Sequence, residues 1–169
     1  MSHLHAILRS LLKDGVSLSA LLAQANTLFS EGTLSRHFAT LVFGRADSSG
    51  RVELCNAGHC PPFIIRGSKL EIVPPTSYAL GLFAHGTFQT RVFQLEPDDS
   101  LFLYTDGLIE ARNPVEVQYG EERLSELISK RAALPPRELT AACRDDLVNF
   151  LAGAKRLDDL AILVLKKEG

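Results

Sequence analysis

The chain has 169 residues, a formal net charge of −2, 46% hydrophobic residues and 22% charged residues. These values predict one globular domain spanning residues 1–169, and no apolar run is long enough to cross a bilayer, so we expect no membrane insertion. Lysine and arginine are scattered along the chain, so no basic face is offered to nucleic acid. With three cysteines and no signal-peptide pattern after Met1, the expected compartment is the cytoplasm.

Two amphipathic helices open the expected order of elements. Hydrophobic residues recur at helical spacing over residues 4–12, and Gly15 follows where a helix would stop. Residues 18–29 repeat the same period, with Ser17 as a plausible N-cap and Gly32 as the stop.

From residue 38 the pattern becomes that of β-strands. We expect three hairpins, pairing residues 38–43 with 51–55, 63–66 with 70–73, and 88–95 with 100–105. Two further helices, 121–130 and 136–151, and a last strand, 160–165, complete the chain. Tight turns join antiparallel strands, and amphipathic helices need a sheet face to cover, so the expected fold class is α+β.

Two aspartates stand at the ends of apolar, strand-like runs. Asp106 follows residues 101–105, and Asp158 shortly precedes residues 160–165. Burying an ionised carboxylate without a partner costs several kcal/mol, so such a pair favours a site that holds a metal ion. The spacing alone also allows a simple Asp-Gly turn at Asp106 and a solvated strand edge at Asp158.

Other chemistries find less support in the sequence. His59 lies near Cys55 and Cys60, but no second ligand pair of the spacing typical of zinc sites is present, so we expect His59 to orient a turn or line the edge of a site. The glycine-rich motifs of serine hydrolases and of phosphate-binding loops are absent. Tyr104 stands where haloacid dehalogenase-type phosphatases have their nucleophilic aspartate. Metal-assisted hydrolysis is the chemistry that the residues favour.

Five ordered motifs extend over the whole chain. They are Asn56-Ala-Gly-His59-Cys-Pro-Pro62, Leu80-Gly-Leu82, Leu103-Tyr-Thr-Asp106-Gly-Leu-Ile-Glu-Ala-Arg-Asn113, Tyr119-Gly-Glu-Glu-Arg-Leu124 and Asp158-Asp-Leu-Ala-Ile-Leu-Val164. In this order they resemble the SpoIIE-like branch of the metal-dependent, PPM-type serine/threonine protein phosphatases. The resemblance implies a PPM-phosphatase-like sandwich of two antiparallel β-sheets flanked by helices.

The resemblance also implies an activity and a set of site residues. The activity is hydrolysis of phosphoserine or phosphothreonine on a protein such as an anti-sigma-factor antagonist, as part of bacterial sigma-factor regulation. Asp106 and Asp158 match the family's metal-ligating aspartates, which in a complete domain hold two Mn²⁺ or Mg²⁺ ions. Gly107 and Asp159 would lie just behind these ligands. Asn56 and His59 match a family motif, and we expect them to have a structural role at the edge of the site.

The departures from the family pattern qualify these expectations. The upstream Gly-Asp and Asp-x-x-Gly-His motifs, whose carboxylates complete the metal centre in the family, do not occur, so the chain resembles an N-terminally truncated phosphatase domain. With half of the ligands we expect weak or no metal binding and little or no activity from the chain as given. Strand edges left without their usual neighbours would suit a homodimer. The alternative function is a non-catalytic, phosphatase-derived protein-interaction module.

Overall fold

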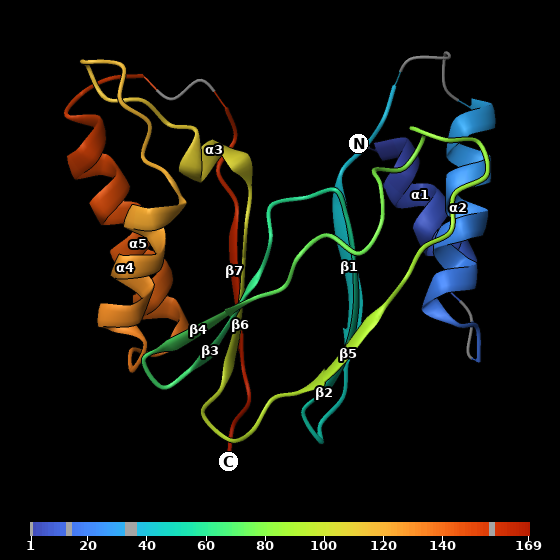
Figure 1. Ribbon diagram of the computed structural model, residues 1–169, viewed down its shortest axis with the longest axis horizontal. Coiled ribbons are helices and arrows are strands. Elements are labelled where there is room, and N and C mark those ends of the chain that lie inside the picture. Colours follow the sequence, from blue (N-terminus) through green and yellow to red (C-terminus); the bar gives the residue numbers. More distant parts are fainter. Residues whose placement is uncertain (1, 13–14, 33–36, 156–157) are drawn as a thin grey trace. The chain divides into compact units, whose positions relative to one another are not determined.

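The computed structural model describes residues 2–12, 15–32, 37–155 and 158–169. The chain folds into two compact units. The first contains Met1–His59 and Pro74–Gln94, and the second contains Cys60–Val73 and Leu95–Gly169. Each unit has its own antiparallel sheet and its own helices (Figure 1).

The first unit combines two helices with a three-stranded sheet of order β1-β2-β5. The elements are α1 (Ser2–Leu11), α2 (Leu18–Gly32), β1 (Leu41–Ala46), β2 (Arg51–Ala57) and β5 (Arg91–Gln94). The hydroxyl of Ser17 accepts a hydrogen bond from the Ala20 amide at 3.3 Å, which confirms Ser17 as the N-cap of α2. Leu22 and Ala25 of α2 pack with Cys55 and Ala57 of β2 in one buried cluster, so the helices cover one face of the sheet.

The second unit has a four-stranded sheet of order β4-β3-β6-β7 and three helices. The strands are β3 (Phe63–Arg66), β4 (Lys69–Ile72), β6 (Ser100–Tyr104) and β7 (Ile162–Lys166), and the helices are α3 (Asp106–Ile109), α4 (Glu121–Arg131) and α5 (Pro136–Leu151). Phe63, Phe102 and Tyr104 pack against buried side chains of α4 and α5, including Cys143. Each such fully buried apolar side chain contributes about 1.5–3 kcal/mol relative to exposure, and this core fixes the ends of β6 and β7.

Most of the predicted elements are confirmed, with three corrections. The first strand begins at Leu41 and not at Phe38; Phe38 is 62% exposed, and Ala39 makes only an isolated bridge with Leu80. The predicted hairpin between residues 88–95 and 100–105 is wrong, because β5 pairs with β2 while β6 pairs with β3 and β7. The short helix α3 was not expected from the Asp-Gly pair.

The turn between β5 and β6 shows why this hairpin does not form. The Asp99 carboxylate is largely buried, forms an ion pair with Arg66 of β3, and accepts a hydrogen bond from the Glu96 amide at 2.9 Å. The turn is therefore anchored to the second sheet, and β6 continues beside β3. No helix in the described parts of the chain is long and apolar enough to span a membrane.

Candidate metal centre

The two segments that carry the predicted aspartates, Asp106 and Asp158, lie side by side at one corner of the second unit. Thr105 lies between the end of β6 and the start of α3, and the segment leading into β7 runs antiparallel beside it. The Thr105 hydroxyl donates a hydrogen bond to the Asp159 carbonyl at 3.0 Å and accepts one from the Ala161 amide at 2.9 Å. The Thr105 amide also donates to the Ala161 carbonyl at 3.1 Å. These bonds join two segments that are 54 residues apart in the sequence. We call Asp106, Gly107, Asp158 and Asp159 the carboxylate corner.

Gly107 permits this close approach. It is buried, and a Cβ atom at this position would lie 2.3 Å from the carbonyl oxygen of Asp159 and 3.4 Å from the carbonyl carbon of Asp158. Side chains essentially never approach backbone atoms so closely, so only glycine lets α3 pack directly on the Asp158–Asp159 segment. The glycine of the Asp-Gly pair thus determines how near the two aspartates come.

Both aspartates present their carboxylates in the same way. Oδ1 of Asp106 accepts a hydrogen bond from the Gly107 amide at 2.9 Å, and Oδ1 of Asp158 accepts one from the Asp159 amide at 2.7 Å. Both side chains are exposed, and neither Oδ2 atom accepts a hydrogen bond from the residues that the structure describes. One oxygen of each carboxylate is therefore held by the backbone while the other is available to a cation.

The donors of the corner suit a hard divalent cation, which prefers carboxylate oxygens. Two carboxylates alone are fewer than the six or so ligands that Mg²⁺ or Mn²⁺ takes. Within the described ranges, no group of three or more histidine, cysteine, aspartate or glutamate side chains is arranged to hold a metal ion. The corner therefore fits part of a metal site.

Two glutamates add negative charge beside the corner. Burial, followed by the carboxylates of Asp106, Glu121 and Glu110, raises the pKa of the Cys60 thiol to about 11. Burial also raises the pKa of Tyr104, and the Glu121 carboxylate, which accepts a hydrogen bond from the Tyr104 hydroxyl at 3.4 Å, adds to the effect. Sequence reasoning did not single out Glu110 or Glu121. Their charges make the surroundings of Asp106 more favourable to a cation.

Asn56 and His59 belong to the first unit, whereas the four residues of the corner belong to the second. Asn56 is fully buried; its Oδ1 accepts a hydrogen bond from the His59 amide at 2.9 Å, and its Nδ2 donates to the His59 carbonyl at 3.2 Å. The Nδ1 atom of His59 lies 3.1 Å from the Thr40 hydroxyl. In the structure Asn56 thus closes the loop after β2.

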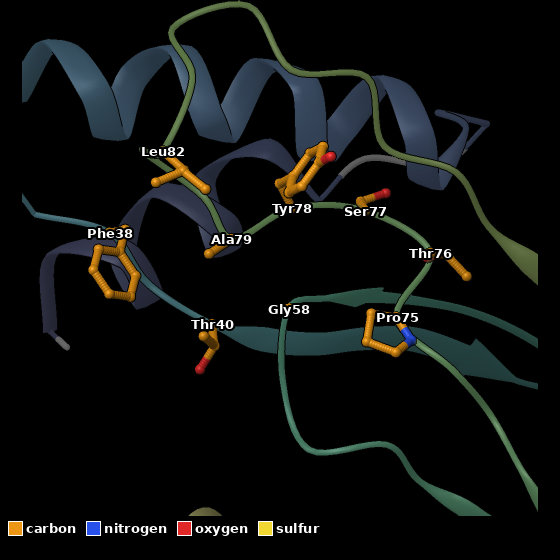
Figure 2. A pocket seen from close by; sticks show the side chains of 9 residues that line it. All are labelled: Phe38, Thr40, Gly58, Pro75, Thr76, Ser77, Tyr78, Ala79 and Leu82. Atoms are coloured by element: carbon orange, nitrogen blue, oxygen red, sulfur yellow. The ribbon is translucent and has the colours of Figure 1, made fainter.

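The same loop borders a pocket of about 580 Å³ in the first unit. Figure 2 shows its lining, which consists of Phe38, Thr40, Gly58, the segment 75–79 and Leu82. None of the described residues that line it carries a charged side chain. This pocket therefore offers apolar and hydroxyl contacts, and its described lining supplies no carboxylate or imidazole to hold a metal ion.

Comparison with known proteins decides the family. The family model described as stage II sporulation protein E (SpoIIE) matches residues 1–168. The chain belongs to this family. It is 30% identical to protein IcfG of Synechocystis sp. over 130 residues, and this alignment covers 76% of the chain and 20% of IcfG. It is 27% identical to phosphoserine phosphatase RsbP of Bacillus subtilis over 113 residues, and this alignment covers 63% of the chain and 28% of RsbP.

Solved structures of SpoIIE-like and related phosphatases share the fold. The RsbU and RsbW domains of Rv1364c from Mycobacterium tuberculosis match with a TM-score of 0.80 and 28% identity, over 99% of the chain and 48% of that structure. The SiaA-PP2C domain of Pseudomonas aeruginosa matches with a TM-score of 0.80 and 16% identity, over 98% of the chain and 65% of that domain. These matches confirm the α+β, PPM-type (PP2C-like) fold and the SpoIIE-like branch that the motifs predicted. The chain spans between 20% and 28% of the length of the curated SpoIIE-family relatives it matches.

Proposed function

We propose that this chain acts as a metal-dependent serine/threonine protein phosphatase domain in bacterial signalling or sigma-factor regulation. The observation that carries the proposal is the carboxylate corner, which brings Asp106 and Asp158 together in a chain of the SpoIIE family. Residues 1–169 would work as one partial phosphatase domain, since the family model spans both units.

Each residue of the corner has a definite task in this proposal. Asp106 and Asp158 would hold the metal through their exposed carboxylates, and Gly107 permits the close packing of α3 on the Asp158–Asp159 segment. The ions of the complete domain would be Mn²⁺ or Mg²⁺, and a bound ion of this kind supplies a nucleophilic water at neutral pH. Asn56 and His59 hold the loop after β2 and take no part in the chemistry.

The proposed substrate is a phosphorylated protein in the cytoplasm, such as an anti-sigma-factor antagonist. The relative RsbP is named a phosphoserine phosphatase, and Rv1364c carries an RsbW domain beside its RsbU domain, which supports a substrate of this kind. A homodimer is also proposed. Leu163 and Leu165 are exposed on β7, at the edge of the second sheet, where a second chain could cover them.

Hydrolysis of a phosphoserine protein in Mn²⁺ tests the function, using the protein as its gene encodes it. Asp106→Asn should lower the rate at least about 100-fold with the fold intact, because the neutral amide oxygen is a much weaker ligand for a divalent cation than the carboxylate. Asp145→Asn is the matched control, since Asp145 is exposed on α5 and, among the described residues, pairs only with Arg144. Near-normal turnover by Asp106→Asn would refute the role of Asp106.

The second candidate is a non-catalytic interaction module derived from a phosphatase. It is favoured by the metal-ligand set, which in the described residues stops at two carboxylates. The same assay separates the two candidates. Metal-dependent hydrolysis that Asp106→Asn abolishes supports the enzyme, whereas a well-folded protein without hydrolysis in either form supports the module.

A further inference from the structure

A small hairpin extends from the carboxylate corner. Residues 111–119, which we call the Arg112 hairpin, follow directly after α3. Arg112 and Gln118 form a β-bridge, and the Tyr119 amide donates a hydrogen bond to the Ala111 carbonyl at 2.8 Å. The Gly120 amide donates to the Ile109 carbonyl at 2.9 Å, so the base of the hairpin is tied to the end of α3. The hairpin is thus held in a fixed position relative to Asp106.

Asn113 orders the tip of the hairpin. Its Oδ1 accepts hydrogen bonds from the amides of Val115 at 3.1 Å and Val117 at 3.0 Å, and the Glu116 amide donates to its backbone carbonyl at 2.9 Å. The two valines held in this way are 74% and 54% exposed. The tip therefore presents two apolar side chains on an ordered backbone, so a partner can bind them at little entropic cost.

A pocket of about 400 Å³ lies between the hairpin and the corner. Its walls include Arg112 of the hairpin, Gly107 and Asp158 of the corner, and Lys155. Arg112 donates a hydrogen bond to the Glu116 carbonyl at 2.7 Å, but neither Arg112 nor Lys155 forms an ion pair with a carboxylate of the described chain. Among the described residues, two cationic side chains thus stand beside the candidate metal centre without an ion-pair partner.

The carboxylates in the pocket restrict which anion can bind there. Glu110, Glu116 and Asp158 also line it, so the lining carries charges of both signs and would repel a polyanion. A single acidic side chain could pair with Arg112 or Lys155 and avoid most of that repulsion. The pocket therefore suits a peptide with a single acidic side chain better than nucleic acid.

We propose that the Arg112 hairpin and Lys155 bind the phosphoprotein substrate at residues that flank its phosphoserine or phosphothreonine. This inference rests on the proposed function. When the phosphorylated residue lies at Asp106 and Asp158, the residues before and after it in the substrate lie within a few ångströms of it. The pocket adjoins the carboxylate corner, so these neighbouring residues would face it. An acidic side chain of the substrate lies between Arg112 and Lys155, and an apolar side chain contacts Val115 and Val117.

Peptide binding tests the inference without requiring turnover. The probes are three fluorescent peptides, one with phosphoserine flanked by aspartate and leucine, one with lysine in place of aspartate, and one with serine in place of leucine. Fluorescence anisotropy should show that Lys155→Ala weakens binding of the first peptide about 5- to 10-fold and removes the preference over the lysine peptide. Val115→Ala should weaken binding of the two peptides that carry leucine by about 3-fold and leave binding of the serine peptide unchanged.

Matched controls come from the same unit. Lys130→Ala removes an exposed lysine of α4, and Val148→Ala removes an exposed valine of α5, so both should leave binding within about twofold of wild type. The measurement is made on the gene-encoded protein carrying Asp106→Asn, which prevents turnover during the titration.

Activity separates the inference from the proposed function. In the protein with Asp106 intact, Lys155→Ala should lower kcat/KM for the aspartate peptide through KM, whereas the control Lys130→Ala should leave kcat/KM for this peptide unchanged. Equal peptide preference in wild type and Lys155→Ala, or no preference for aspartate at all, overturns the inference while the phosphatase stands. If no phosphatase activity exists, the proposed function fails, and the anisotropy series still supports or refutes the binding surface.

Discussion

Replacing Gly107 by alanine should disrupt the carboxylate corner. In an open helix this substitution stabilises a protein by about 0.5–1 kcal/mol, because alanine loses less conformational entropy than glycine on folding. At position 107 the new Cβ would lie 2.3 Å from the Asp159 carbonyl oxygen and 2.9 Å from its carbonyl carbon. These nearest atoms belong to the backbone, so no flexible side chain can move away to relieve the clash.

The clash should outweigh the gain in helix propensity. Overpacking typically costs about 1–3 kcal/mol. Moving α3 away also weakens the bonds of Thr105 to Asp159 and Ala161, each worth about 0.5–1.5 kcal/mol. We therefore expect Gly107→Ala to lower the free energy of unfolding by about 1–3 kcal/mol, a fall in Tm of roughly 3–10 °C for a chain of this size.

Urea and thermal unfolding, followed by circular dichroism, measure this effect. Gly86→Ala is the matched control, because its new Cβ would meet only side-chain atoms, the nearest being Cε2 of Phe88 at 3.3 Å. The control should change stability by no more than about 0.5 kcal/mol. If Gly107→Ala is as stable as wild type or more stable, the close packing of α3 on the Asp158–Asp159 segment is refuted.

Three further measurements test the loop after β2, an ion pair and a thiol. Asn56→Ala should lower stability by about 1–3 kcal/mol, because it leaves the part-buried amide and carbonyl of His59 without these hydrogen bonds. The exposed Asn149→Ala should have little effect, and equal stability of the two variants would contradict the role of Asn56. The hydrogen bonds from Arg123 hold the pKa of Asp146 below its usual value, so their stabilisation is complete above about pH 4 and is lost as the pH falls through the folded-state pKa. Thermal unfolding of wild type and Asp146→Asn should therefore differ at pH 7 and converge at lower pH, and a pH-independent difference would count against the pairing. Because the pKa of Cys60 is raised from 9.0 to about 11, its thiolate fraction at pH 8 is about 100-fold lower than in the unfolded chain. Iodoacetamide labelling followed by mass spectrometry should therefore show slow alkylation of Cys60. An alkylation rate equal to that in urea would refute the burial of this thiol.

The sequence predicts best where local signals and tertiary packing agree. Helix α5 was predicted with its observed bounds, because Pro136 can begin a helix and an apolar stripe including Cys143 marks the buried face. The hairpin of β3 and β4 was predicted to within one residue, since a two-residue turn at Gly67 separates two apolar runs.

Pairing between distant strands was less predictable. Residues 91–94 and 100–104 form strands on either side of a turn, and a hairpin is the simplest interpretation of that pattern. Their true partners lie elsewhere in the chain, and the ion pair of Asp99 with Arg66 that directs β6 to β3 has no local signature. Sheet order is a tertiary property, so periodicity alone does not determine it.

In the candidate site, too, local features could be predicted, whereas contacts between distant segments could not. Asp106 and Asp158 could be found because each follows or precedes an apolar run and matches a family motif. Their meeting depends on the antiparallel register of β6 and β7 and on the hydrogen bonds of Thr105. Glu121, which lies 15 residues after Asp106 in the sequence, comes near Tyr104 and Cys60 through the packing of α4 on the second sheet.

Calorimetric titration of Mn²⁺ tests most directly whether the carboxylate corner is a metal site. The gene-encoded protein is titrated beside Asp106→Asn, Asp158→Asn and the control Asp145→Asn. We predict that each of the first two substitutions weakens Mn²⁺ binding at least about tenfold, while the control binds as wild type does. Equal affinity in all four proteins would contradict the assignment of Asp106 and Asp158 as metal ligands.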